Sequence, residues 1–109
     1  MNKTIKTIKK IRPKNDWAKV LYILNDSDKV SMADVLTKYD STFYKFQARL
    51  SELEREHTFV VGRKLVPFKN KLTGKSGYFT EYSVKNKKFI KSLLTKVNEF
   101  GLAAKNENL

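Results

Sequence analysis

Apolar residues recur at helical spacing in four stretches of the chain. The first two stretches are "NDWAKVLYILND" (15–26) and "VSMADVLTKYD" (30–40), and polar residues around Ser27 separate them. Asn15 or Asp16 can cap the first helix, whereas Ser31 followed by Asp34 resembles a capping box for the second. The expected inward faces are Trp17, Val20, Leu21 and Leu24 in the first helix, and Met32, Val35, Leu36 and Tyr39 in the second. The second helix is only about two turns long.

The third helical stretch, "STFYKFQARLSELEREH" (41–57), has two unlike halves. Its first half offers hydroxyls, a lysine, a glutamine and an arginine, whereas its second half contains three glutamates. The face expected to pack in the core consists of Phe43, Phe46, Leu50 and Leu53. The pattern predicts a turn of about three residues after the short helix, then a helix over about 41–56, which is helix–turn–helix spacing.

After His57 apolar residues recur at nearly every second position, and this period predicts β-strands. "TFVVGRKLVPFKN" and "YFTEYSV" are rich in β-branched and aromatic residues, and "KLTGKSG" between them suits a basic hairpin tip. Pro67 has no N–H, so we expect its strand to lie at an edge. From about Asn86 the helical period returns, and Gly101 is suited to end that helix. Its apolar stripe consists of Phe89, Ile90, Leu93, Leu94, Val97 and Phe100.

This order of elements predicts an α+β fold of the winged helix–turn–helix class. The class has a three-helix core and a two- to three-stranded β wing, here with an extra C-terminal helix; a short strand near "KVS" (29–31) would complete the sheet. The length of 109 residues suits one domain. The expected organisation is a basic flexible arm over 1–14, the winged helix–turn–helix domain over 15–84, an amphipathic helix over 85–101 and a frayed tail over 102–109.

The net charge of +12 is distributed unevenly along the chain. Residues 1–14 contain six Lys or Arg and no acidic residue, whereas residues 15–57 contain six basic and eight acidic residues. The region 58–84 has five basic residues and one acidic, and 85–109 has six basic and two acidic. Such a surface favours a polyanionic partner, because each Lys or Arg placed on a phosphate releases condensed counterions. A lysine-rich surface that serves solubility alone is the alternative.

The polarity of the 41–57 helix matches insertion of its first half into a DNA groove. The N-terminal part of a recognition helix enters the major groove and its C-terminal part leaves the duplex, so carboxylates are tolerated only in the second half. The hypothesis is therefore sequence-specific binding of double-stranded DNA. The predicted contact residues are Ser41, Thr42, Tyr44, Lys45, Ala48 and Arg49 in the helix, Lys69, Lys71 and Lys75 at the hairpin tip, and Lys9, Lys10 and Arg12 in the arm.

Several of these residues have purely structural alternatives. Tyr44 could pack on the preceding helix, Arg49 could pair with Glu52 or Asp40, and Ser41 could serve only as an N-cap. Gln47 could read adenine only if it reaches the bases. On the first strand, Arg63 and Lys64 could form a solvated face. The arm could be disordered in the free protein and become ordered on binding.

The segment "FQARLSELEREHTFVVGRKLVPFKNKLTGKSGYFTEYSV" resembles the small winged helix–turn–helix proteins of bacteriophages and mobile elements. Arg49-Leu50-Ser51-Glu52-Leu53 and Tyr82-Ser83-Val84 carry the resemblance, which covers about residues 15–84. It implies a transcriptional or phage and mobile-element regulator. The segment "REHTFVVGRK" departs from the family, because it lacks the Lys-Gly-Tyr/Trp type of turn that often precedes the wing.

Other classes of function find less support in the sequence. The chain has no cysteine, one histidine (His57) and no phosphate-binding loop, so we expect no enzyme, metal site, cofactor or small-molecule ligand. It has no membrane-spanning run, and its start lacks the apolar core of a secretory signal, so we expect a cytoplasmic protein without membrane attachment. A non-catalytic winged-helix module for protein interaction is the competing hypothesis. The last helix could pack on the first or form a homodimer.

Overall fold

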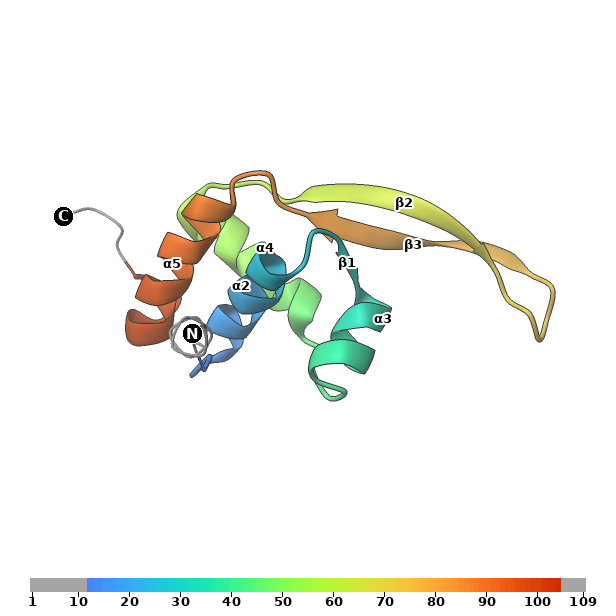
Figure 1. Cartoon of the computed structure of the whole chain (residues 1–109), viewed down its shortest axis with the longest axis horizontal. Coiled ribbons are helices and arrows are strands. Elements are labelled where there is room, and N and C mark those ends of the chain that lie inside the picture. Colours follow the sequence, from blue (N-terminus) through green and yellow to red (C-terminus); the bar gives the residue numbers. More distant parts are fainter. Residues whose placement is uncertain (1–11, 105–109) are drawn as a thin grey trace, which may run out of the picture.

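The computed structural model describes residues 12–104, in which three longer helices and a short one accompany a small sheet. The elements are α2 (Asp16–Asp26), β1 (Val30–Ser31), α3 (Met32–Asp34), the π-helical turn η1 (Val35–Tyr39), α4 (Phe46–His57), β2 (Gly62–Lys69), β3 (Ser76–Ser83) and α5 (Lys87–Phe100). The helices gather at one end of the molecule, and the β2–β3 hairpin projects from them (Figure 1). The fold is α+β, as predicted, and the arrangement is compatible with a winged helix.

Helix α2 begins where the sequence predicts, because Asn15 caps it. The Asn15 side-chain oxygen accepts a hydrogen bond from the Ala18 amide at 2.8 Å. The Asn15 side-chain nitrogen donates to the Val97 carbonyl at 3.0 Å, so the same residue joins the start of α2 to α5. The residues that α2 buries are Ala18, Val20, Leu21, Ile23 and Leu24. Trp17, expected to face inward, is only half-buried.

The capping box predicted at Ser31 is present. The Ser31 hydroxyl accepts a hydrogen bond from the Asp34 amide at 3.2 Å, and the Asp34 carboxylate accepts one from the Ser31 amide at 3.0 Å. The short helix then widens into η1, in which the Asp40 amide donates to the Val35 carbonyl at 2.9 Å. Of its four expected inward residues only Val35 is fully buried; Met32, Leu36 and Tyr39 are half-buried.

The third helix starts later than predicted, at Phe46 instead of Ser41, and residues 40–45 form turns. The predicted three-residue turn and the N-cap role of Ser41 are therefore wrong. The cause is local, because an Asp40 carboxylate oxygen accepts hydrogen bonds from the Thr42 amide at 2.9 Å and the Thr42 hydroxyl at 2.7 Å. Short polar side chains that bond to nearby backbone compete in this way with helix formation. Lys45 precedes α4 and provides no side-chain cap.

The predicted inward face of this region is nevertheless buried. Phe43 contributes from the connection, and its ring meets that of Phe46 edge-on with centroids 6.1 Å apart. Leu50 and Leu53 lie on the same buried face of α4. The apolar side chains thus reach the core whether the backbone that carries them is a turn or a helix.

The sheet is antiparallel, with strand order β1–β3–β2. The two-residue strand β1 confirms the strand expected near 29–31, and its Val30 lies opposite Tyr82. The β2–β3 ladder runs without a bulge from Gly62 opposite Ser83 to Lys69 opposite Ser76. Strand β2 lies at the edge of the sheet, where Pro67 needs no outward N–H.

Helix α5 packs its apolar stripe against α2, which confirms one of the two alternatives for this helix. Its buried residues are Ile90, Leu93, Leu94 and Val97, in the same core as α2 and α4. Phe100, by contrast, is 69% exposed. Gly101 ends the helix with φ 85°, as predicted. Residues 102–104 begin the segment expected to fray, yet Ala104 is buried and the His57 ring donates to the Leu102 carbonyl at 2.7 Å.

Candidate nucleic-acid interface

Most of the contact residues predicted before and within α4 are exposed to solvent. Ser41, Thr42, Tyr44 and Lys45 lie in the connection, and Ala48 lies in the first turn of α4. Tyr44 is 72% exposed, so the alternative that it packs on the preceding helix is wrong. No side chain caps the start of α4, where Phe46 is buried and Gln47 and Ala48 are exposed.

Arg49 differs from its neighbours, because its side chain is only 22% exposed and faces two carboxylates. One guanidinium nitrogen donates to both Glu52 oxygens, at 2.9 and 2.8 Å, and another lies 3.8 Å from the Asp16 carboxylate. The guanidinium also lies 5.8 Å from the centre of the Trp17 ring. The pair with Glu52 was one alternative for this residue; its second partner is Asp16, not Asp40. Arg49 therefore fastens α4 to the start of α2.

Glu52 completes this connection from the acidic half of α4. The Trp17 indole N–H donates to its carboxylate at 2.7 Å. Hydrogen bonds from Trp17 and from Arg49 hold the pKa of Glu52 below its ordinary value, so the carboxylate stays ionised and paired. The negative charge at this point of the helix thus has a partner within the protein.

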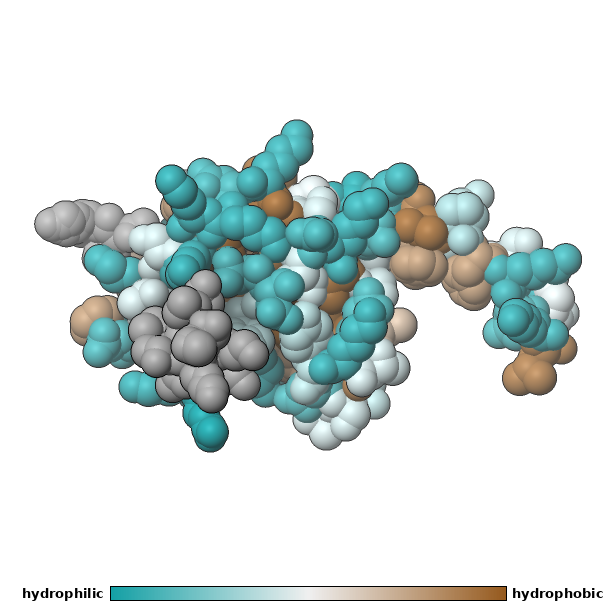
Figure 2. Space-filling model, in the orientation of Figure 1, coloured by the Kyte–Doolittle hydropathy of each residue, from teal (hydrophilic) through white to brown (hydrophobic). Residues whose placement is uncertain are grey.

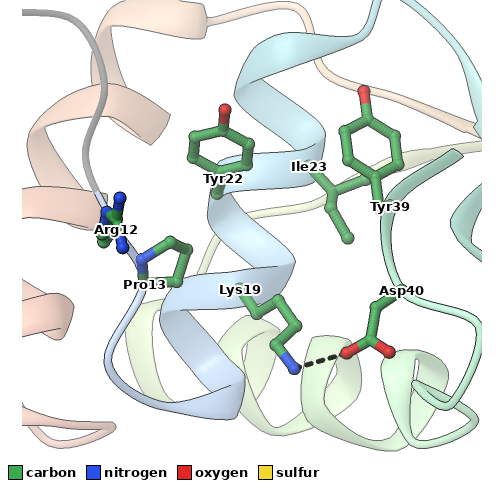
Figure 3. Close-up of a pocket in the computed structure, with 7 residues that line it drawn as sticks. All are labelled: Arg12, Pro13, Lys19, Tyr22, Ile23, Tyr39 and Asp40. Carbon is green, nitrogen blue, oxygen red and sulfur yellow. Dashed lines mark hydrogen bonds and ion pairs between the residues drawn. The ribbon is translucent and has the colours of Figure 1, made fainter. Parts of the chain in front are cut away.

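Asp40, in the connection before α4, is paired in the same way. The Lys19 ammonium donates to its carboxylate at 2.7 Å (Figure 3). Hydrogen bonds from Lys19, and then from the hydroxyl and amide of Thr42, hold the pKa of Asp40 well below its usual range. Lys19 also lies 4.7 Å from the centre of the Phe43 ring, so the pair sits directly beside the core.

The arm residue Arg12 lies across a shallow hollow from this pair. The hollow has a volume of about 430 Å³, and Tyr22, Ile23 and Tyr39 also line it (Figure 3). The backbone here is held by Asn98, whose side chain accepts from the Lys14 amide at 2.6 Å and donates to the Arg12 carbonyl at 3.2 Å. The structure therefore brings Arg12 near the connection before α4. Lys9 and Lys10 lie outside the described residues.

For Arg63 the sequence left two alternatives open, a DNA contact or a place on a solvated face. In the structure Arg63 has a partner within the protein. It donates two hydrogen bonds of 2.9 Å to the Glu54 carboxylate, which also accepts from the Val61 amide at 2.9 Å. Burial raises the pKa of Glu54, but these hydrogen bonds outweigh it, so the pKa lies below its ordinary value. The end of α4 is thus fastened to the start of β2.

Gln47 makes a similar connection to the other strand of the hairpin. Its amide donates to the Tyr82 hydroxyl at 2.8 Å, and the Tyr82 ring packs against Phe46 with centroids 5.6 Å apart. Although the Gln47 residue is exposed, its amide is therefore directed to the protein rather than left open.

The remaining predicted contacts are at the far end of the hairpin. Lys69 ends β2, and Lys71 and Lys75 lie in the tip; all three are exposed and form no ion pair among residues 12–104. The hairpin carries the basic tip away from α4 (Figure 1).

Sequence reasoning missed the apolar surface of this hairpin. The exposed side chains are Leu65, Phe68, Leu72, Tyr78 and Phe79, and Figure 2 shows hydrophobic atoms along the hairpin among hydrophilic ones. The ladder places Leu65 and Tyr78 on one face and Phe68 and Phe79 on the other. The sequence could have revealed this surface, because it places apolar residues on both faces of the hairpin. A strand that packs on a single core needs apolar residues on only one face.

Comparison of the chain with protein-family models, curated proteins and solved structures finds no match. Between residues 12 and 104, every helix is too short or too polar to cross a bilayer.

Proposed function

We propose that this protein is a winged helix–turn–helix protein that binds double-stranded DNA in a sequence-specific way, as a transcriptional or phage and mobile-element regulator. The order of helix, short strand, short helix, helix and hairpin supports this proposal, as does the three-stranded sheet with β1 beside β3. In such an arrangement the helix before the hairpin enters the major groove, and the hairpin contacts the duplex beside it.

The observation that carries the proposal is the internal pairing of the acidic groups around α4. Asp16 and Glu52 face Arg49, Asp40 is bound by Lys19, and Glu54 is bound by Arg63. Lys45 and the three tip lysines, in contrast, have no carboxylate partner within residues 12–104. At the start of α4 the unpaired charge is therefore that of Lys45, which suits a phosphate backbone, whereas the exposed Glu56 lies at the opposite end of the helix.

Within this proposal the predicted contact residues divide into two groups. Lys45 donates to phosphate, Tyr44 and Ala48 face the base edges, and the uncapped amides of Gln47 and Ala48 at the start of α4 bind phosphate. Arg49 is a positioning residue, because its guanidinium is already bound by two carboxylates and holds α4 at its angle to α2. A homodimer through α5 would rest on Phe100 and the half-buried Phe89, and it stays a prediction.

The test is selection of bound sequences from a random duplex pool, followed by affinity measurements over a series of salt concentrations. We expect a defined motif and an affinity that falls steeply as salt rises. Lys45→Ala should weaken binding to all sequences about equally and reduce the slope of log affinity against log salt by about one.

Lys91→Ala is the matched control, since Lys91 is an exposed lysine on α5 with no assigned contact. We expect it to leave the slope close to that of the unmodified protein. A slope near zero for the unmodified protein, or equal effects of the two substitutions, would contradict the proposal.

A non-catalytic module for protein interaction is the second candidate. It is favoured by the apolar hairpin surface, where Phe68 and Phe79 line a shallow hollow of about 370 Å³ together with Ser31 and Ala33. An interaction module would show no mobility shift with any duplex in the pool, and it would lose its protein partner when Phe79 is changed to Ser. If the first proposal holds, the Phe79→Ser variant should still shift duplex DNA and select the same motif.

A further inference from the structure

The tip of the β2–β3 hairpin ends in an exposed leucine. Leu72 is 95% exposed, the highest value among the large hydrophobic residues of the described chain. It lies in the six-residue tip between Lys69 and Ser76. A side chain this exposed contributes nothing to the core, so its apolar surface is free to contact a partner.

The tip is a defined turn rather than a loose loop. The Asn70 side-chain oxygen accepts hydrogen bonds from the Leu72 amide at 2.9 Å and the Thr73 amide at 3.2 Å. The Asn70 amide donates to the Lys75 carbonyl at 2.8 Å, and the Gly74 amide donates to the Asn70 carbonyl at 2.7 Å. Gly74 adopts φ 74°, a conformation that favours glycine. The turn therefore holds the Leu72 backbone in place while its side chain points into solvent.

The hairpin carries this turn well beyond the helices (Figure 1). Each strand has eight residues, which at about 3.3 Å per residue gives an arm of about 26 Å. Near the tip, the Phe68 ring lies over Gly77 so closely that a Cβ on Gly77 would come within 3.0 Å of it. The Phe68 ring also meets Phe79 with centroids 6.1 Å apart. These contacts stiffen the outer half of the arm.

Lysines surround the leucine. Lys69, Lys71 and Lys75 lie within three residues of Leu72 and are all exposed. Proteins that bend DNA combine these two features, because an apolar side chain inserted from the minor groove unstacks a base step while cations on either side hold the phosphates. Lysines alone would suffice for simple backbone contact, and the exposed leucine among them supplies the apolar group that a wedge requires.

We propose that Leu72 acts as a wedge that enters the DNA minor groove and bends the duplex, with Lys71 and Lys75 on the flanking phosphates. This inference rests on the proposed function, since it requires duplex binding. It adds that the protein deforms its target, and that flexible steps such as TA at the contact point are favoured because they unstack easily.

The experiment uses the full chain and a short duplex with a central TA step and a dye at each end, in low salt. Binding is measured by anisotropy, and bending by energy transfer between the dyes. We expect the unmodified protein to increase energy transfer, as a bend of roughly 20–90° would. Leu72→Ala should still bind, within about tenfold of the original affinity, but should leave energy transfer close to that of free DNA. Leu72→Met should retain the bend.

Val60→Ala is the matched control, since Val60 is also a highly exposed apolar residue, at 85%, in the connection between α4 and β2. We expect it to retain both binding and bending. Binding without a rise in energy transfer, or a full bend by Leu72→Ala, would overturn the wedge and leave the proposed function standing. Failure of the unmodified protein to bind any duplex would overturn both. Retention on phosphatidylserine vesicles that depends on Leu72, without DNA bending, would assign the tip to a membrane surface and overturn the wedge.

Discussion

At the scale of single residues, Asp40 decides where the helix facing the proposed DNA surface begins. Its carboxylate binds the amide and hydroxyl of Thr42 and the ammonium of Lys19. The first two bonds hold the connection in a turn, and the third fastens that turn to α2. As a result, the turn before α4 contains Thr42, Tyr44 and Lys45, and the spacing of an α-helix does not determine where their side chains lie.

Asp40→Asn separates the charge of this residue from its turn-forming role, because an amide oxygen can still accept from Thr42. We expect a modest loss of stability at neutral pH, measured as a lower melting temperature, since the Lys19 ion pair is lost. The pKa of Asp40 is depressed in the folded protein, so the contribution of its charge is present above the unfolded value of about 3.9 and is lost as the pH falls further. The difference between the two proteins should therefore shrink below about pH 4.

Asp28→Asn provides the control for this prediction, because Asp28 is exposed and forms no ion pair among residues 12–104. It should melt at nearly the same temperature as the unmodified protein at every pH. A difference between the original protein and Asp40→Asn that stays constant from neutral to acidic pH would show that the charge of Asp40 is unimportant.

At the scale of the elements, the ends of the helices are set by different means. Asn15 and Asn86 cap α2 and α5 with their side chains, α4 has no side-chain cap, and Gly101 ends α5 through its backbone. The uncapped end is the one that the proposed function directs to phosphate. Among these three helices, α2 and α5 have a side-chain N-cap and α4 does not.

The end of α5 offers a test of this backbone role. Gly101 has φ 85° and ψ −169°, a region that is essentially restricted to glycine, and an added Cβ would meet no atom within 4 Å. Gly101→Ala should therefore destabilise the protein by about 1–3 kcal/mol through backbone strain alone. The measurement is the free energy of unfolding in urea.

Gly101→Asn distinguishes this conformation from the ordinary left-handed one, which asparagine tolerates. We expect asparagine to be no better than alanine at this position. If asparagine restored most of the stability, residue 101 would have to adopt the left-handed helical region instead.

At the scale of the whole molecule, one buried cluster joins all the helices to the base of the sheet. Residues from α2, α4 and α5 share it with Val30 and Tyr82, and Ala104 covers it after the last helix. The final helix is therefore part of the core that supports the proposed DNA-binding surface, although it lies outside residues 15–84, for which the sequence predicted the winged helix–turn–helix domain.

Leu94→Ala tests this shared core, since Leu94 is 1% exposed on the face of α5 that packs on α2. We expect a loss of about 2–5 kcal/mol in the free energy of unfolding, with a single transition for the whole chain. DNA affinity should fall only where the variant begins to unfold. Ser92→Ala, on the exposed side of the same helix, should change stability by less than about 0.5 kcal/mol. Two separate transitions would indicate that α5 folds independently.

Much of the fold could be predicted from local patterns. The period of apolar residues located α2, the hairpin and α5, the Ser31–Asp34 spacing located the capping box, and Gly101 marked the end of α5. The inward residues Phe43, Phe46, Leu50 and Leu53 were also correct, although their backbone was not wholly helical. These features depend on interactions within a few residues, or on burial, which requires only that apolar side chains share one side.

The start of α4 and the partners of the charged residues could not be predicted in this way. An aspartate followed by serine and threonine is compatible with a helix cap or with a turn, and the bond from Lys19 to Asp40 spans 21 residues of sequence. Likewise, Arg49 has Glu52 nearby in sequence, but Asp16 and Trp17 reach it only after α2 and α4 pack together.

The amino-acid sequence by itself thus determined the order of elements, the composition of the core and an excess of positive charge, because local propensity and hydrophobic burial depend on residue type and spacing. Only the tertiary structure decided which charges are neutralised within the protein and which face solvent. Ion pairs form between side chains that packing brings within a few ångströms of each other, and sequence distance does not determine that proximity. The same packing left Leu72, at the end of the hairpin, exposed to solvent among the residues that the structure describes.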